Sequence, residues 1–448
     1  MPGLTRRTFL RVGASSLAAV SLAACAGTGT SQRPAPASGS TTAAGPGKLT
    51  GKVTFMAWGT PPAVVERKQF CVDFDKEHPG ASCSFILAPG NYMDKLLTMV
   101  AGNDAPDVFF VSPTNLPEFI GKNLLHPLDA FIASSHYDIQ DFIPAALKQY
   151  QQSGKTYGFP RGFGMEAVFY NVDLFHKAQL PSVPADLKDT SWTFRALLQR
   201  AQQLTSGNGP TKTFGYIVNP ANSREWMTYV WSNGGEVFNH DYTQCLLDQP
   251  PAVEALQFLQ DLIAKYRVAP TPAIMQTTNV MNMFDSGRVA MSISEPFTFA
   301  QRRKDAKFTW DVGVTPAGKH GRIPGGGGVG WGMYAKTKVP DLAWQVLAGL
   351  SGKRFQTEEL RDGTTAPPRL SVLNSKAFLN PSQPPAHAAL FIEEVRYVRT
   401  DPQPPNWPEI NTALNKEFSY LWTGERTALT VAKAAVAAVT PLLGKPIA

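Results

Sequence analysis

The stretch KVTFMAWGTPP, residues 52–62, begins the part of the sequence that decides the fold. Its first half is rich in apolar, β-branched and aromatic side chains, as in a buried strand, and the glycine and prolines end that strand. Residues 63–77 then read as a helix, 82–87 as a strand, 93–100 as an amphipathic helix and 107–111 as a third strand. This alternation predicts an α/β fold with a parallel sheet covered by helices on both faces.

The rest of the chain continues the same alternation. We expect strands at 165–170, 214–218, 289–293 and 311–314, and helices at 193–204, 253–263 and 339–350. One sheet spread over about 400 residues would be unusually large, so we expect two α/β lobes between which the chain crosses.

Composition supports a folded, loop-rich protein and gives little support to nucleic-acid binding. Of 448 residues, 43% are hydrophobic, enough for a sizeable core, and 37 glycines with 37 prolines favour many turns. No glycine period or heptad pattern indicates collagen or a coiled coil. The net charge of +7 includes three arginines near the N-terminus, so the remainder carries about +4, without any lysine or arginine run.

The N-terminus predicts export. An arginine pair in TRRTFLR (5–11) precedes an uncharged stretch at 12–24, too short to span a membrane as a permanent anchor. TRRTFLR resembles a twin-arginine signal, and LAAC (22–25) resembles the lipobox of bacterial lipoproteins, in which Cys25 carries the lipid; a cysteine buried in an apolar helix is the alternative. We therefore expect a signal peptide at 1–24 and a lipidated, flexible tether at 25–50 that holds the body at the outer face of the cytoplasmic membrane.

Three cysteines remain in the body. Cys71 and Cys83 form a disulfide or stay buried thiols, and the sequence leaves both alternatives open; Cys245 is the third. No Cys-x-x-Cys motif or nearby histidine pair indicates a zinc site. We expect no metal and no cofactor.

Nine local signatures from residue 52 onward occur in an order that resembles the family 1 extracellular solute-binding proteins of ABC transporters, whose relatives include the maltose-binding protein. They are KVTFMAWG (52–59), FDKEHPG (74–80), APDVFFV (105–111) with LLHPLD (124–129), YGFPRGFGMEAVFYNVDLF (157–175), WTF (192–194), WSNGGEVF (231–238), RVAMSISEPF (288–297), DVGVTPAG (311–318) and LAWQVLAGLSG (342–352). The resemblance implies a type II-like periplasmic-binding fold of two α/β lobes, with the ligand in the cleft between them. It places the chain crossings near 162–166, 311–314 and 364–369. The lobes would then be residues 51–165 plus 311–365, and 166–310 plus 366–448.

Aromatic residues at expected loop and strand ends are the first candidates for ligand contact. Flat rings cover the CH faces of sugars, while carboxylates and amides take the hydroxyl groups. Trp58 ends a strand, and the resemblance places the other candidates where maltose-binding relatives supply ring contacts. Packing in the core is the alternative for each of Trp58, Trp226, Trp231, Phe297 and Trp407.

Polar candidates follow the same logic. Thr60, Thr114 and Asn115 lie at the carboxyl ends of expected strands, where ligands gather in open α/β sheets, and Thr114 is also a candidate helix cap. Glu166 and Glu295 are candidates to accept hydrogen bonds from ligand hydroxyl groups, with backbone capping or pairing to an arginine as the alternative. Among the cations, Arg161 and Arg369 would indicate a phosphorylated or carboxylated ligand if both faced the cleft.

The run GGGGVG at 325–330 formally satisfies G-x-G-x-x-G, but its context argues against a dinucleotide site. That fingerprint needs a strand before it and a helix after it, whereas WGMYA (331–335) reads as a strand. Close approach of the backbone to a ligand, or a flexible strand start, explains the glycines better. Gly327 and Trp331 are therefore binding candidates.

These observations favour a substrate-binding lipoprotein that captures a sugar or oligosaccharide and delivers it to the membrane subunits of an ABC importer. We expect a monomer that contacts the membrane only through its lipid. The alternatives are a non-sugar solute such as a glycerophosphodiester, a polyamine or iron, and, less favoured, a glycan hydrolase or a sensor. No GxSxG or HExxH motif supports an enzyme, and the 7 histidines are scattered.

Overall fold

The structure is a computed structural model, and it describes residues 49–88, 90–361 and 366–444. The signal expected at 1–24, the lipidation site Cys25 and most of the tether lie outside these residues. Within the described ranges, no helix is long and apolar enough to cross a membrane.

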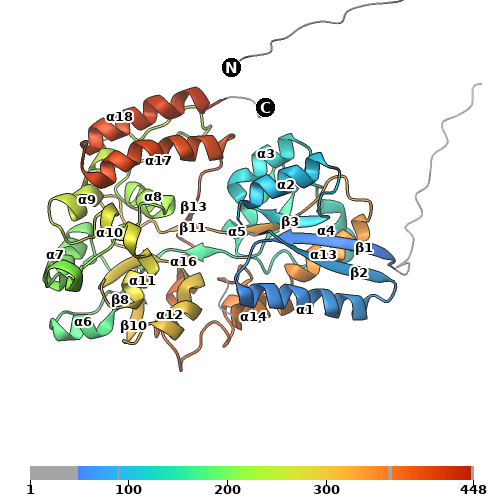
Figure 1. Ribbon diagram of the computed structural model, residues 1–448, viewed down its shortest axis with the longest axis horizontal. Helices are drawn as coiled ribbons and strands as arrows, with labels where there is room; N and C mark the ends of the chain where they lie inside the picture. The colour runs from blue at the N-terminus through green and yellow to red at the C-terminus, as the bar shows by residue number, and fades with distance from the viewer. Residues whose placement is uncertain (1–48, 89, 362–365, 445–448) are drawn as a thin grey trace, which may run out of the picture. The chain divides into compact units, whose positions relative to one another are not determined.

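The first sheet has five strands in the order β2-β1-β3-β12-β6. They are β1 (Gly51–Ala57), β2 (Ala81–Leu87), β3 (Val108–Val111), β6 (Gly158–Pro160) and β12 (Gly330–Met333). β1 pairs in parallel with β2 and β3, as expected, and the late strand β12 inserts antiparallel between β3 and β6. Helix α1 (Pro61–Glu77) packs along β2, and α13 (Pro340–Leu350) packs on β1 and β12 (Figure 1).

A second sheet, in the order β10-β8-β9, is formed by β8 (Ala167–Asn171), β9 (Met291–Ser294) and β10 (Trp310–Gly313). Both of its pairings are antiparallel. The strand expected at 214–218 takes part only through isolated parallel bridges, from Phe214 to Val289 and from Ile217 to Ser292. The second part of the chain therefore has a mixed sheet pattern rather than the mainly parallel one expected for each lobe.

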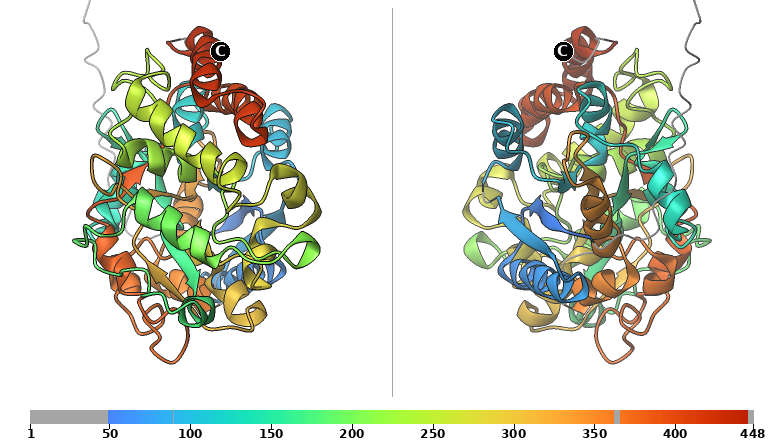
Figure 2. Two further views of the ribbon diagram at one scale, coloured as in Figure 1. Left: turned by 90° about the vertical axis from the view of Figure 1, so that its left-hand side faces the viewer. Right: turned by 90° about the vertical axis from the view of Figure 1, so that its right-hand side faces the viewer.

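Helices cover both sheets. Around the first lie α2 (Tyr92–Ala101), α3 (Leu116–Gly121), α4 (Asp129–Ser135), α5 (Pro144–Lys148) and α14 (Lys353–Arg361). The remaining helices are α6 (Val172–Lys177), α7 (Phe194–Leu204), α8 (Ser223–Ser232), α9 (Pro250–Ala264), α10 (Pro272–Thr277), α11 (Val280–Asp285), α12 (Phe299–Asp305), α15 (Leu370–Leu373), α16 (Leu390–Glu394), α17 (Trp407–Thr423) and α18 (Ala428–Val439). α17 and α18 pack against each other and against α9, and Figure 2 shows the pair in two further views.

Short elements complete the chain: the β4 (Gln151–Gln152) and β5 (Lys155–Thr156) hairpin, and the 3₁₀ turns η1 (Pro113–Asn115), η2 (Gly209–Thr211), η3 (Pro296–Thr298) and η4 (Thr440–Leu442). Thr114 lies inside η1, where its hydroxyl shares a hydrogen bond with that of Ser112 at 2.8 Å. The cap of α3 is Asn115, which makes no side-chain cap bond, so the expectation that Thr114 caps this helix is wrong.

Two hydrophobic cores divide the described chain. One surrounds the first sheet and draws on residues 53–159 and 331–355; the other surrounds the second sheet and draws on 143–314 and 360–439. We call the parts around these cores the first and the second lobe. The residue limits that the sequence suggested for the lobes remain a prediction.

Two neighbouring extended segments connect the cores. The chain runs from β6 directly into β7 (Gly164–Met165), and from β11 (Gly325–Gly327) directly into β12. β6 pairs with β12 in the first sheet, while β7 pairs with β11 in a third sheet ordered β13-β11-β7, completed by β13 (Arg399–Thr400). The first crossing is therefore close to where the sequence placed it. The second lies at 325–333 instead of 311–314, because the latter segment forms β10 beside β8. The third, near 364–369, falls partly outside the described residues.

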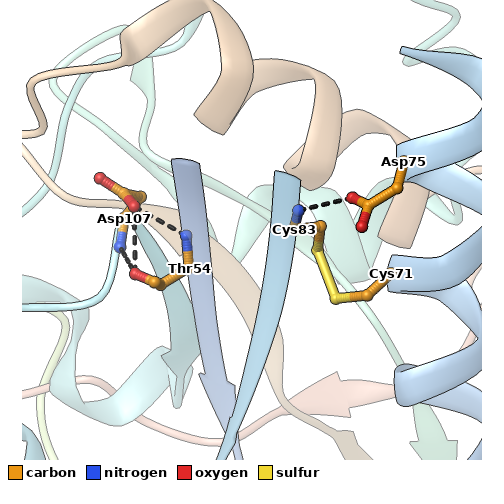
Figure 3. The surroundings of a disulfide bond; sticks show 5 residues. All are labelled: Thr54, Cys71, Asp75, Cys83 and Asp107. Atoms are coloured by element: carbon orange, nitrogen blue, oxygen red, sulfur yellow. Dashed lines mark hydrogen bonds between the residues drawn. A yellow bond between two sulfur atoms is a disulfide. The ribbon is translucent and has the colours of Figure 1, made fainter. Parts of the chain in front are cut away.

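A disulfide joins Cys71 of α1 to Cys83 of β2, which resolves the alternative that the sequence left open (Figure 3). The Asp75 carboxylate accepts a 2.7 Å hydrogen bond from the backbone of Cys83. On the other side of β1, Asp107 accepts bonds from the backbone and hydroxyl of Thr54 at 2.8 and 3.0 Å. A covalent link and polar links thus tie β2 to α1 and the start of β3 to β1.

Candidate ligand-binding site

An ion-pair cluster beside the crossing strands forms the centre of the candidate site. Arg224, the second residue of α8, donates from Nε to Oδ1 of Asp401 at 2.9 Å, and its two Nη atoms pair with Asp401 and Glu295. Asp401 follows β13 and Glu295 follows β9, so three elements distant in sequence meet here. Burial lowers the pKa of Arg224, but Asp401 and Glu295 together raise it above its ordinary value, so the guanidinium stays charged.

Glu166 lies directly behind this cluster, between β7 and β8, and is fully buried. Its carboxyl oxygens accept hydrogen bonds from Asn222 at 3.0 Å and from Thr228 at 2.6 Å. Burial raises the pKa of Glu166 to about 7; the charge of Arg224 opposes the rise and that of Glu295 adds to it. Glu166 therefore changes protonation near neutral pH.

Asn222 explains why α8 presents Arg224 at this place. It is the N-cap of α8, and its side-chain oxygen accepts a hydrogen bond from the backbone N–H of Arg224 at 3.2 Å. The same amide donates to Glu166. One side chain thus starts the helix and fixes its first turn against the crossing strand.

The glycines of β11 leave room for this cluster. A Cβ on Gly327 would lie 2.5 Å from Nη2 of Arg224 and 2.7 Å from Asp401, and a Cβ on Gly325 would lie 2.5 Å from Cγ of Arg224. On β7, a Cβ on Gly164 would overlap the carboxylate of Glu295. The sequence indicated a close approach at this run, and the groups that approach are the side chains of the ion-pair cluster.

A pocket of about 460 Å³ lies beside the cluster and shares Asp401 with it. Its lining includes Trp231, Glu236, Tyr242, Arg399 and Gln403. The Arg399 guanidinium lies 4.7 Å from the centre of the Trp231 ring. Its two Nη atoms pair with the carboxylate of Glu236, at 2.9 Å for Nη1. Trp231 therefore lies beneath an arginine, and the polar groups above it line the pocket.

The pocket side of the second lobe touches the first lobe. Gln403, which lines the pocket, donates from its amide to the backbone oxygen of Gln149 at 3.1 Å. Helix α17 contacts η1, the turn that carries Thr114 and Asn115. Asn115 points its amide to the sulfur of Met93 at 3.3 Å. The cluster and pocket thus adjoin the junction of the two lobes, where a ligand can touch both.

On the first lobe, Trp58 forms an exposed aromatic edge. Its side chain is 38% exposed, and its ring packs edge-on against Tyr92 and Phe110 at 4.8 and 4.7 Å. Arg67 donates to its carbonyl oxygen. Thr60, two residues later, is exposed at the start of α1. The corresponding exposed ring on the second lobe is Phe297, which is 47% exposed and follows Glu295 by two residues.

Other predicted contacts pack inside the lobes, which for Trp226 and Trp407 is the alternative that the sequence left open. Trp331 is fully buried, with its ring 4.2 Å from that of Phe110, and Trp226 packs edge-on against Phe418. Trp407 is buried at the start of α17. In this conformation these rings stabilise the cores.

The two arginines considered as anion-binding candidates, Arg161 and Arg369, also pack inside the protein. Arg161 pairs with Glu359 at 2.7 Å, and Arg369 pairs with Asp141 at 3.2 Å while donating to the backbone of Ser351. Neither therefore supports the anionic ligand that their exposure in the cleft would have indicated. The guanidinium carbon of Arg369 also lies over the ring of Phe142, 4.2 Å from its centre.

Sequence reasoning missed Arg224, Asp401, Arg399 and Glu236. Arg224 follows the loop NPAN (219–222), and Asp401 follows the two-residue strand β13. Polar residues after strand ends were the useful signal, but β13 is too short to be seen in the sequence. Among the described residues, no group of three histidine, cysteine or carboxylate side chains could hold a metal ion.

Comparison with known proteins identifies the class. Residues 60–356 match the model of the bacterial extracellular solute-binding proteins, which covers more than half of the chain. The chain belongs to this family, and its fold is the two-lobed fold of periplasmic sugar-binding proteins.

Three proteins illustrate how similar known proteins are to this chain. A binding protein of Brucella abortus is 26% identical over 377 residues, covering 83% of this chain and 88% of the relative. The arabinooligosaccharide-binding protein of Bacillus subtilis is 26% identical over 306 residues, or 64% and 66% of the two chains. The ABC substrate-binding protein of Listeria monocytogenes, solved in complex with cycloalternan, has a TM-score of 0.78 at 24% identity and covers 87% of this chain and 98% of its own.

Proposed function

We propose that the protein captures a sugar or oligosaccharide between its lobes and delivers it to the membrane subunits of an ABC importer. The observation that carries this proposal is the pocket at Asp401, beside the Arg224 cluster and next to the strands that connect the lobes. Carboxylates and amides there offer hydrogen-bond acceptors and donors to hydroxyl groups. Trp58 and Phe297 offer exposed ring surface on the two lobes. The known ligand classes of the similar arabinooligosaccharide-binding and cycloalternan-bound proteins point the same way.

In this proposal, ligand binds the second lobe and the first lobe closes over it. The paired crossing segments β6–β7 and β11–β12 are the hinge, because each joins a strand of the first sheet to a strand of the β13-β11-β7 sheet. The closed form is then recognised by the permease. X-ray scattering should show a smaller radius of gyration at saturating ligand, and an unchanged radius would contradict closure.

The ligand is sought by thermal shift against a library of neutral oligosaccharides, polyamines, ferric complexes and glycerophosphodiesters. A ligand that binds only the folded state raises the melting temperature by mass action. The proposal is supported if a sugar raises the melting temperature and also shows saturable binding in calorimetry. It is contradicted if only a non-sugar solute raises the melting temperature. Recovery of the bound sugar unchanged after long incubation distinguishes binding from hydrolysis.

We also propose that the mature protein is a monomer, exported by a twin-arginine signal and anchored by a lipid on Cys25. Export and lipid attachment are supported by the order of arginine pair, apolar stretch and LAAC in the sequence. A fatty acyl chain partitions a protein to a membrane, and loss of the thiol removes the attachment point. The Cys25→Ala variant should therefore be lost from the membrane fraction of the cells. Retention of the variant in that fraction would contradict lipid anchoring.

A further inference from the structure

Both arginines of the candidate site are already matched by carboxylates. Arg224 is held by Asp401 and Glu295, and Arg399 is held by Glu236. An arginine that recognises a ligand phosphate or carboxylate usually offers it a pair of parallel N–H groups. Here Asp401 takes that pair on Arg224, from Nε and Nη2. An anionic ligand would have to displace a protein carboxylate that is already in place.

The charge of the surroundings adds to this barrier. The cluster and pocket contain two guanidinium groups and the three carboxyl groups of Glu236, Glu295 and Asp401, and the carboxyl group of Glu166 lies directly behind them. With Glu166 neutral, three negative charges still face two positive ones. A ligand anion about 5 Å from one uncompensated carboxylate loses roughly 300-fold in affinity at an effective dielectric constant of about 20.

The same arrangement suits hydroxyl groups. Arg224 has five N–H donors, and its hydrogen bonds to Asp401 and Glu295 use one on each nitrogen, which leaves one on each Nη. The carboxylate oxygens that hold the guanidinium have further lone pairs for hydroxyl donors. A polyol can therefore bind without breaking any ion pair.

Building on the function proposed above, we infer that Glu295 and Asp401 are specificity-determining residues. By occupying Arg224 they make the site select polyhydroxylated ligands that carry no net negative charge, and reject phosphorylated or carboxylated ones. Gly327 and Gly164 are part of this arrangement, because a side chain at either position would displace one of the two carboxylates.

The test measures binding of inorganic phosphate and of glycerol 3-phosphate by calorimetry at low ionic strength. The proteins are the native chain, Asp401→Asn and the double variant Glu295→Gln/Asp401→Asn. The matched control is Glu417→Gln, which removes the carboxylate of a residue on α17 from its ion pair with Arg426. Circular dichroism confirms that each variant is folded, and the single variant keeps the test informative if the double variant is not.

We expect no anion binding by the native chain or the control, and a gain of roughly ten- to a hundredfold in phosphate affinity when Arg224 is freed. Anion binding by the native chain, or no gain in either folded variant, would overturn the inference. These results do not depend on finding the sugar. If the variants gain phosphate binding while no neutral sugar binds the native chain, the charge preference stands and the proposed sugar ligand fails. If native protein binds glycerol 3-phosphate tightly, it remains a solute-binding protein and the charge preference fails.

Discussion

Replacing Glu166 by glutamine should remove a specific part of the protein's pH dependence of stability. The carboxyl group is fully buried in the crossing segment, and its pKa of about 7 exceeds the ordinary value of 4.5. A raised folded-state pKa means that the native state binds the proton more tightly than the unfolded state does. The contribution of Glu166 to stability is therefore full below pH 4.5 and is lost as the pH rises through 7.

The magnitude follows from the two pKa values. Between pH 5 and pH 8, the native state releases a proton that most unfolded molecules have already lost at pH 5. Linkage then gives a loss of about 2.5 kcal/mol in the free energy of unfolding from this group. Glutamine cannot titrate, so the variant lacks this loss. The charge of Glu166 also raises the pKa of two other buried carboxyl groups, those of Glu225 and Glu394. Its removal lowers both pKa values, which reduces the loss further.

The assay is urea unfolding of the native chain, Glu166→Gln and the surface control Glu417→Gln at pH 5 and pH 8, followed by circular dichroism. The quantity compared is the difference in the free energy of unfolding between the two pH values. The native chain and the control should lose about 2.5 kcal/mol more than Glu166→Gln. Equal losses in all three proteins would refute the reasoning, because Glu166 would then be ionised in the native state at both pH values.

Three further outcomes are expected. Gly328→Ala should lower the melting temperature strongly, since its Cβ would lie 1.9 Å from the backbone oxygen of Gly162 and separate the crossing segments; a melting curve like that of the native chain would contradict this packing. Cys71→Ser/Cys83→Ser should lower the free energy of unfolding by about 3 kcal/mol, because the disulfide closes a short loop, and unchanged urea unfolding would show that it does not form. Phe297→Ala should weaken sugar binding by roughly tenfold, as judged by calorimetry, with the melting temperature unchanged since the ring is 47% exposed; unchanged affinity would remove this ring from the site.

The first lobe was the more predictable half of the fold. Its strands β1, β2 and β3 alternate with α1 and α2, and local periodicity is enough to find each of them. What the sequence cannot show is that β12, more than two hundred residues after β3, enters the same sheet. The second crossing was misplaced at 311–314 for the same reason. The sequences of β10 and β12 both indicate a short strand, and only their pairing partners, β8 for β10 and β3 for β12, distinguish them.

The site was less predictable than the fold. Tryptophan is both a good ligand platform and a good core residue, and a sequence does not show which way a ring points. Trp331 and Trp226 turned inward, whereas Trp58 is partly exposed. Glu166 was found because it lies beside the expected first crossing, and Glu295 because it follows a strand. Arg224, the partner of Glu295, was not found, since its role depends on the meeting of three separate chain segments.

The position of the cluster connects ligand recognition to movement of the lobes. Asp401 follows β13, which pairs with β11, and β11 continues directly into β12 of the first lobe. Glu166 lies on the neighbouring crossing segment and accepts a hydrogen bond from the hydroxyl of Thr228. The same hydroxyl accepts a hydrogen bond from the backbone N–H of Gly325 in β11. A ligand that bonds to Arg224 or Asp401 therefore acts on both of these crossing segments. Because a ligand shifts a conformational equilibrium only by its differential affinity for the two states, contacts made here are well placed to favour the closed state over the open one.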